Sequence, residues 1–468
     1  MSAISALHKG RRQLLGRLNE TFALLNLICN ANSCDLIELD GELDLERLQN
    51  AAEQVIDRHP MARSVSVRRG LYFYWVHCEH RLPIQIETRS INSDDPTVIR
   101  HALLAATWER RVVAHNAHPF RFIYTRTPRG AYLQIITSHV YTDGKAANIF
   151  TGDVAQCYAA LGRGQTWNPP AADIPDRSHD RMFLRGLSWW RRAGLFLQGA
   201  KGLLTDVCMP VGRLAISTPR TTDTDVLMID LPDALTQGLR AQAARRKLTV
   251  HPFLLIAVLR TCEAFNRARG KPARWPLRIV DNFSLRRFSN DPAIEHIYDC
   301  VAVPYKLALD ARRSDDALLQ DMFEALEKLK QGDALAELYR LRFYHWLSLP
   351  MPKTWAVRMA CFMATRADVI CTNVGVLDPR LEHIGDVRVK RYFSFPQLLP
   401  PGKVMYQISS FRGTMRLALL YDRGQLSETE ARRDFADAFI KALGQLVGLG
   451  QPQAEKPTEA TEPDTSYA

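Results

Sequence analysis

The sequence predicts an α/β protein built from two similar lobes. Segments with two-residue hydrophobic alternation are interspersed with segments of helical period, as in folds that combine sheets with covering helices. The order of strand, helix and later strands begins again near the middle of the chain, which favours two related halves over a short-period repeat. With 468 residues, 46% of them hydrophobic and 24% charged, the chain can form two cores. We therefore expect a functional site between the lobes.

The expected N-terminal lobe covers residues 1–165. An amphipathic helix within residues 9–29 opens it, and residues 34–43 alternate like a half-buried strand. A turn at Gly41 leads into a helix that ends at His59-Pro60. The remaining elements are strands near 64–76, 83–87, 120–125 and 131–138, and helices near 96–110 and 144–161.

The expected C-terminal lobe covers residues 226–450 and repeats this order. An apolar strand at 226–231 comes first, followed by a helix from Pro232 and a second helix at 251–265. The later elements are strands near 276–283, 368–376, 404–411 and 415–421, and a closing helix at 427–447. Residues 451–468 are acidic and are expected to form a disordered tail.

Residues 166–225 are expected to link the lobes and to contain a basic amphipathic helix at 181–204. Arginines fall on one narrow face of this helix and large apolar residues on the other, namely Arg181, Arg185, Ser188 and Arg192 against Phe183, Leu187, Trp190 and Leu197. The favoured interpretation is that the apolar face packs on the second lobe while the arginines are solvated. The alternative is peripheral contact with the inner face of a membrane.

The net charge limits the classes of binding partner, and the cysteine pattern indicates the cellular compartment. The net charge is +11, and because residues 451–468 carry one lysine and four acids, the rest of the chain has a charge of +14. A basic body suits nucleic acid, anionic lipid, a phosphorylated cofactor or an acidic carrier protein. Nine cysteines without a C-x-x-C pair indicate neither a disulfide framework nor a zinc ribbon, which favours a reducing cytoplasm.

The strongest chemical signal is His139-x-x-x-Asp143-Gly144. An apolar strand ends at His139, a short turn follows, and Asp143-Gly144 opens a helix. A histidine held at the end of a strand titrates near neutral pH and can act as a general base. The carboxylate of Asp143 can lock the turn by pairing with an arginine, and Gly144 permits close approach of the backbone.

Five segments together resemble the chloramphenicol-acetyltransferase-like superfamily of acyltransferases. They are residues 37–60, the His139 motif, the run Asn-Phe-Ser-Leu-Arg-Arg at 282–287, Thr-Asn-Val-Gly at 372–375, and the final strand pair. The resemblance spans residues 15–447 in the right order. Condensation domains, polyketide-associated acyltransferases and wax ester synthases are members of this superfamily.

The resemblance implies two lobes with an active-site tunnel at their interface. In such a tunnel His139 would be the general base, and Asp143 would be structural, paired with Arg286 or, failing that, with Arg287. Ser138 and Asn373 would be weaker candidates for lining the tunnel. The resemblance implies no tightly bound cofactor and no metal, but acyl-CoA or a phosphopantetheinyl acyl-carrier protein as co-substrate.

Departures from the family pattern favour transfer to an alcohol. Ser138 stands where condensation domains and wax ester synthases have a first histidine, and the Asp-Phe-Gly-Trp-Gly motif of plant enzymes is absent. We therefore predict an O-acyltransferase. A freestanding condensation enzyme that forms an amide, and a non-catalytic member that binds a carrier or lipid, stay open as alternatives.

Other kinds of site lack their motifs. The pairs His77/His80 and His115/His118 have the spacing of zinc ligands but no third ligand nearby. The chain has no nucleophile elbow, Walker A sequence or dinucleotide fingerprint. Aromatic residues are not interleaved with basic ones as a nucleic-acid surface requires.

Overall fold

The computed structural model describes residues 12–449 except 27–28, 70–71, 79–82, 113–118, 171–177, 219–220, 222, 273, 349–351, 353–354, 356–365 and 400. The expected acidic tail at 451–468 and the histidines His80, His115 and His118 lie outside the described residues. In the described part, no helix is long and apolar enough to cross a membrane, and the eight cysteines there are free thiols.

The first sheet has six strands in the order β12-β13-β2-β7-β6-β5. Alternate residues of its central strands face opposite layers, as the period of two requires: Ile37 packs with the helices of one face and Leu36 with the helix of the other. Helices α3 (Leu45–Arg58) and α5 (Gly144–Gly162) cover the first face, and α4 (Pro96–Trp108) covers the second. The strands are β2 (Asn32–Leu39), β5 (Ile86–Ser90), β6 (Phe120–Thr127), β7 (Gly130–Ser138), β12 (His383–Ile384) and β13 (Val387–Pro396).

The second sheet also has six strands, in the order β10-β9-β11-β14-β15-β8. They are β8 (Thr224–Asp230), β9 (Leu277–Ser284), β10 (Ala302–Leu309), β11 (Val369–Val376), β14 (Val404–Phe411) and β15 (Thr414–Asp422). The second core contains residues of these strands together with α8 (Asp233–Arg245), α9 (His251–Ala268), α10 (Asp315–Lys330) and α14 (Ala438–Leu446). A short helix, α13 (Glu428–Glu430), and a π-helical stretch at Ala431–Asp437 lead into α14.

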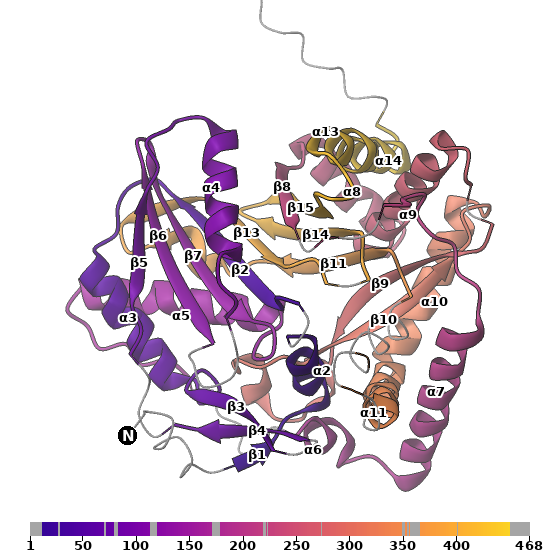
Figure 1. Cartoon of the computed structure of the whole chain (residues 1–468), viewed down its shortest axis with the longest axis horizontal. Coiled ribbons are helices and arrows are strands. Elements are labelled where there is room, and N and C mark those ends of the chain that lie inside the picture. The colour runs from indigo at the N-terminus through magenta and orange to yellow at the C-terminus, as the bar shows by residue number, and fades with distance from the viewer. Residues whose placement is uncertain are drawn as a thin grey trace, which may run out of the picture.

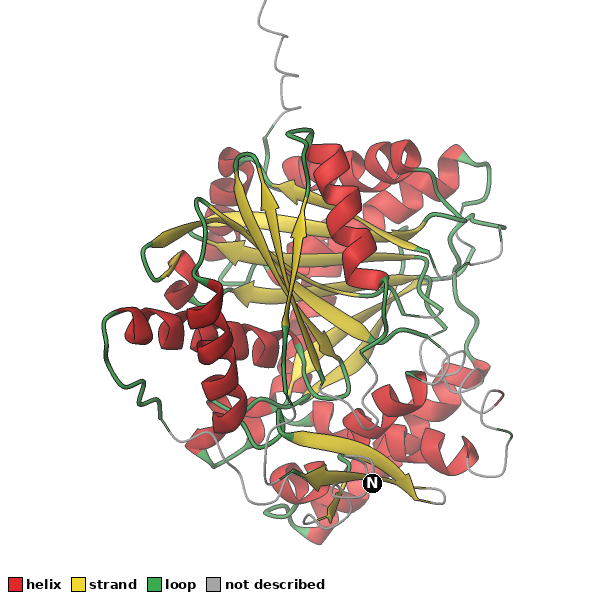
Figure 2. Ribbon diagram, turned by 60° about the vertical axis from the view of Figure 1, so that its left-hand side comes forward, coloured by secondary structure: helices red, strands yellow, loops and turns green. Residues whose placement is uncertain are grey.

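The expected two-lobed α/β fold is confirmed by these two sheets, which lie side by side in Figure 1 and overlap in the turned view of Figure 2, with helices around them. A smaller three-stranded sheet, β1 (Arg12–Leu14), β4 (Tyr72–His77) and β3 (Ser64–Arg69), lies beside the first lobe. The predicted single strand at 64–76 is therefore a hairpin. Residues from both large sheets form a shared apolar cluster, in which Leu36 and Ile136 meet Val226 and Leu420.

The domain boundary predicted at residue 226 is wrong for residues 383–396. Strand β13 pairs antiparallel with β2, with Tyr392 opposite Ile37, so this segment completes the first sheet before β14 returns to the second. At the crossing, the backbone N–H of Gln397 donates to the Asn32 carbonyl at 2.7 Å. The sequence analysis predicted no strand at 387–396, and hydrophobic alternation could not have shown its partner, which lies about 350 residues earlier. The crossing ties the two lobes together by main-chain hydrogen bonds.

The predicted continuous helix at 181–204 is wrong in two respects. It is broken into α6 (His179–Leu184) and α7 (Trp189–Cys208), and the Ser188 hydroxyl caps α7 by accepting from the Arg191 N–H at 3.3 Å. Helix α7 packs on α11 (Ala336–Ser348), but through Leu195 and Gly199. Trp190 and Leu197, which were predicted to face the second lobe, are 70% and 67% exposed.

Candidate active site

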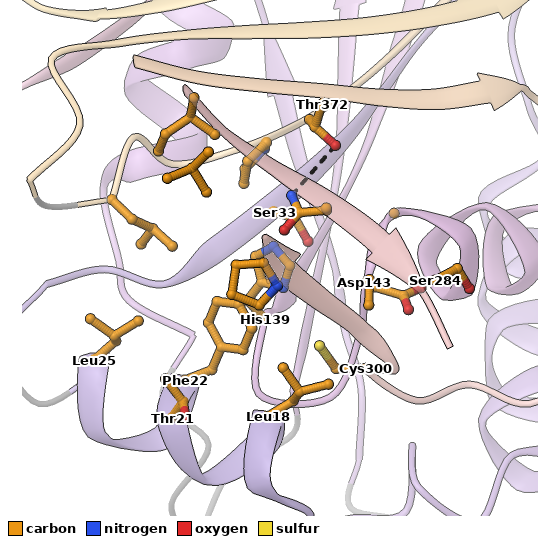
Figure 3. Close-up of a pocket in the computed structure, with 18 of the residues that line it drawn as sticks. Leu18, Thr21, Phe22, Leu25, Ser33, His139, Asp143, Ser284, Cys300 and Thr372 are labelled. Carbon is orange, nitrogen blue, oxygen red and sulfur yellow. Dashed lines mark hydrogen bonds between the residues drawn. The ribbon is translucent and has the colours of Figure 1, made fainter. Parts of the chain in front are cut away.

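A cavity of about 290 Å³ lies between the two sheets, beside α2 (Arg17–Leu25). Both lobes contribute walls: Ser33 and Phe395 come from the first sheet, and Val280, Thr372 and Met405 from the second. Figure 3 shows His139 in the middle of this cavity, between α2 and the strands of the second sheet. The structure therefore places the predicted base in an interlobe space.

The backbone and an aromatic ring fix the position of His139. Strand β7 ends at Ser138, and the N–H of His139 donates to the Ala31 carbonyl at 2.7 Å, next to β2. The imidazole is stacked on Phe22 of α2, with ring centroids 4.3 Å apart and an interplanar angle of 1° (Figure 3). One face of the imidazole is thereby covered, while the side chain stays partly exposed to the cavity.

Burial sets the protonation state of His139. Enclosure in protein lowers the pKa of His139 below its ordinary value of 6.5, although the backbone at Thr142 and the charge of Asp143 act in the opposite direction. At neutral pH the ring is therefore predominantly uncharged. A neutral imidazole that faces a substrate cavity can accept a proton.

Asp143 and Arg286 meet across the lobe interface. Arg286 Nη1 lies 2.8 Å from Asp143 Oδ2, and both side chains are 4% exposed. The same oxygen accepts from the Val301 N–H at 3.0 Å, and Oδ1 accepts from the Ala146 N–H at 2.8 Å, which caps α5. The alternative partner, Arg287, is exposed.

These contacts keep Asp143 ionised. Burial alone would raise its pKa, but the charge and hydrogen bond of Arg286 and the two backbone donors outweigh burial, so the pKa lies below the ordinary 3.8. An ionised carboxylate that already accepts three hydrogen bonds is a poor proton acceptor. Its geometry instead fixes the turn that carries His139 and joins α5 to the second lobe.

Gly144 and Asn373 line the cavity from different lobes, at a point where the lobes approach closely. A Cβ atom on Gly144 would come within 3.3 Å of Val374 Cγ2, so the strand of the second lobe passes close to the first turn of α5. Asn373 lines the cavity, and its side-chain oxygen accepts from the Gly375 N–H at 2.9 Å across an irregularity in the pairing of β11 with β14.

Ser138 does not line this cavity, contrary to the weaker prediction. It is fully buried, it lies 3.5 Å from the amide nitrogen of Asn26, and successive residues at the end of β7 point to different sides. Ser33, which the sequence analysis did not single out, lines the cavity, and its hydroxyl bonds that of Thr137 at 2.8 Å.

Helix α2 contributes residues that sequence reasoning missed. The amide of Asn19 donates to the Val140 carbonyl at 2.8 Å and to Asp299 at 2.9 Å, so it holds both the histidine turn and the second lobe. Glu20 lines the cavity, and burial raises its pKa, while Arg17 at 3.2 Å acts in the opposite direction. The helical period predicted a helix here, but it gave no sign that its buried face meets the His139 turn.

Helix α11 supplies a further wall through Arg340, Tyr344 and His345. His345 Nδ1 lies 3.5 Å from Glu20, yet burial and the charge of Arg17 lower the pKa of His345 to about 4. This histidine is therefore neutral at physiological pH and adds no cation to the cavity.

Among the described residues, the group that could hold a metal ion lies elsewhere. His101, Asp225 and Glu428 bring their ligand atoms within 4.8 Å of one another. Arg100 already bonds Asp225 at 3.0 Å and Glu428 at 2.6 Å. The guanidinium of Arg100 thus already balances the negative charge of these carboxylates, and we do not propose a metal ion there.

Comparison with known proteins identifies the family. The condensation-domain family model matches residues 28–262, about half of the chain. A segment of 172 residues is 28% identical to CymA, a protein of Salinispora arenicola (strain CNS-205) named a probable non-canonical nonribosomal peptide synthetase; the match covers 33% of this chain and 2% of that much longer protein.

Solved structures show the same fold along nearly the whole chain. The first condensation domain of the calcium-dependent antibiotic synthetase, in complex with a substrate analogue, has a TM-score of 0.71 at 17% identity, covering 93% of this chain and 96% of that one. The condensation domain of the polyketide synthase MokA gives 0.67 at 13% identity (94% and 98% covered), and the epimerization domain of tyrocidine synthetase B gives 0.64 at 14% (94% and 98%). Because condensation and epimerization domains share this fold, the fold alone does not choose the reaction. The chain belongs to the condensation-domain family, within the chloramphenicol-acetyltransferase-like superfamily, a family of acyl- and peptidyl-transferring proteins.

Proposed function

We propose that this chain transfers an acyl group from a thioester of CoA or of an acyl-carrier protein to a hydroxyl group in the interlobe cavity, with His139 as general base. The observation that carries the proposal is His139 itself, which burial keeps neutral and which Ala31 and Phe22 hold in place at the cavity. The chain covers only a small part of the curated relative, so the donor carrier and the acceptor are part of this proposal.

The chemistry balances with a single base. His139 takes the proton of the acceptor hydroxyl as its oxygen attacks the thioester carbonyl. The C–O bond forms, the C–S bond breaks, and the proton passes to the departing sulfur as the thiol. A positioned base contributes about 10² to 10⁴-fold, and holding both substrates in one cavity contributes more. Asp143 and Arg286 act as positioning residues through the turn.

The charge of the cavity favours a hydroxyl over an amine. Three of its cations are paired with acids, Arg17 with Glu20, Arg286 with Asp143 and Arg340 with Glu337, so the exposed Lys145 carries the excess of positive charge among the lining residues. An alkylamine is mostly an ammonium ion at neutral pH and would be opposed by this excess, whereas an alcohol enters uncharged. The same excess suits the phosphate of a pantetheine donor.

An amide product is the second candidate, because the structural neighbours include condensation domains of peptide synthetases. The substitution at Ser138 no longer argues against it, since this residue is buried away from the cavity. A non-catalytic, carrier-binding role is the third alternative, and it predicts no turnover with any acceptor.

A paired acceptor panel tests the proposal. Octanoyl-CoA and an octanoyl-loaded carrier protein would each be offered to the full chain with 1-octanol, octylamine or both, and ester, amide and free thiol would be quantified by mass spectrometry. We expect ester in excess of amide, and its loss in His139→Ala but not in His383→Ala, a histidine exposed on the surface. Amide as the main product would overturn the choice of acceptor. No product from any donor would support the non-catalytic alternative.

A further inference from the structure

Helix α7 has an outward apolar stripe in addition to the face that packs on α11. Trp190, Leu197 and Leu204 follow one another at intervals of seven residues, which places them close to one line along the helix. They are 70%, 67% and 64% exposed, whereas Leu195 and Gly199 are buried. Over its 20 residues the helix is about 30 Å long, and Figure 1 shows it along the outer edge of the molecule.

The stripe continues onto α11 and forms one surface, here called the α7–α11 face. Phe196 meets Phe343 edge to face at 5.0 Å, and Phe343 meets the exposed Trp346 at 5.8 Å. Sixteen large apolar side chains are exposed in the described part of the chain; seven belong to residues 189–209, and two more, Trp346 and Leu347, belong to α11. Apolar exposure is therefore concentrated on this one face, the mark of a contact surface.

The charge around the α7–α11 face is of one sign. Residues 181–205 contain five basic residues and no acid, and residues 338–348 of α11 contain Arg340 and Arg342 and no acid, although the chain has 50 acids in all. Asp206, which follows the first stretch, is buried and bonded to Lys306 and Tyr344. Of the acids on packed neighbours, Asp333 lies 3.7 Å from Arg191, and Glu337 is paired with Arg340.

We propose that the α7–α11 face docks on an anionic lipid surface. Exposed tryptophan and leucine side chains beside arginine and lysine are the composition of helices that lie in the membrane interface, where aromatic rings enter the headgroup region and cations meet lipid phosphates. A stripe that runs the length of a helix on the outer edge of the molecule fits a deformable, extended partner. An anionic lipid surface also accounts for the absence of acids from both stretches, because lipid phosphates would repel a carboxylate on this face.

Docking by this face would bring the lipid close to the cavity. Helix α11 presents Phe343 and Trp346 to the α7–α11 face, while its Arg340, Tyr344 and His345 line the cavity. A single helix thus separates the two. The inference stands apart from the proposed reaction, because a lipid surface can be bound whether the product is an ester, an amide or nothing.

Vesicle flotation of the full chain tests the proposal without any substrate. The probes are vesicles of phosphatidylcholine alone and of phosphatidylcholine with about 30% phosphatidylglycerol, at low salt and at about 0.5 M NaCl. We expect binding to the anionic vesicles that weakens with salt, and a loss of at least about tenfold in Leu197→Glu/Leu204→Glu. The control is Phe323→Glu, which puts a single glutamate on an exposed apolar position of α10, and Leu197→Glu alone is compared with it at equal charge.

Wild-type protein supplies a readout that does not depend on the folding of the variants. Anionic vesicles should shift the tryptophan emission to the blue and protect it from acrylamide, since Trp189 and Trp190 are 62% and 70% exposed. No flotation and no spectral change at low salt would overturn the proposal. The proposal would also be overturned if the α7–α11 face bound an acidic apo-carrier protein, or a second copy of the chain, but no vesicles. Equal losses of vesicle binding in the test variant and in Phe323→Glu would overturn it as well.

Discussion

Replacing Asp143 by asparagine should destabilise the protein far more than the same change at an exposed helix cap. Asparagine can still cap α5 through Ala146, but it removes the charge that balances Arg286, and both side chains are 4% exposed. Leaving one partner of a buried ion pair uncompensated costs about 3–5 kcal/mol. Asp44→Asn is the matched control: Asp44 caps α3, pairs with Arg47 and is 50% exposed, so it should cost less than about 1 kcal/mol.

Urea or guanidinium unfolding of five proteins measures this prediction: wild type, Asp143→Asn, Arg286→Met, the double variant and the control Asp44→Asn. Removing both charges should recover at least about 1 kcal/mol relative to Asp143→Asn alone, because the buried cation is then absent. The pKa of Asp143 is lowered in the folded state, so its stabilisation is complete above the ordinary value of 3.8 and is lost as pH falls through the folded value. The gap between wild type and Asp143→Asn should therefore narrow below about pH 4. An Asp143→Asn protein as stable as Asp44→Asn would refute the reasoning.

Four further predictions test the site. The acid limb of kcat/KM should have its midpoint below pH 6.5, because burial lowers the pKa of His139 and protonation abolishes the base; a midpoint above 6.5 would contradict this. Phe22→Ala exposes the imidazole to water and should move that midpoint to higher pH, whereas an unchanged midpoint would show that the stacked ring does not set it. Ser138→His should cost about 1–3 kcal/mol in unfolding experiments, because the position is fully buried, and should leave the ester-to-amide ratio unchanged. Gly144→Val should lower stability by about 1–3 kcal/mol, and Gly144→Ala by less, because the first added carbon already meets Val374 at 3.3 Å; equal stability of all three would argue against that contact.

Local patterns were sufficient for most elements, because hydrophobic periods report which face of a segment is buried. The strand that ends at Ser138, the helix that begins at Gly144 and the strand at 369–376 lie where alternation and turn residues predicted them. The contact of Asp143 with Arg286 followed from the family resemblance, because no local pattern links residues 143 positions apart.

Long-range pairing could not be predicted in this way. The return of β13 to the first sheet depends on main-chain contacts with β2, and the wall formed by α2 depends on how Asn19 and Phe22 dock on the His139 turn. On α7, the helical period correctly separated polar from apolar residues. The face that packs on α11, however, is the one that carries Gly199, because this glycine permits close approach of the two helices, and Trp190 and Leu197 are therefore exposed to solvent. Small residues at a helix contact reverse the expectation that the largest apolar side chains face inward.

The central claim is that His139 is the base for acyl transfer in the interlobe cavity, and single-turnover transfer from an octanoyl-loaded carrier to 1-octanol tests it most directly. Rates would be compared for wild type, His139→Ala and His383→Ala, after circular dichroism and unfolding have shown that all three are folded. The account predicts a loss of about 10² to 10⁴-fold in His139→Ala alone. Transfer by His139→Ala at the wild-type rate would contradict it.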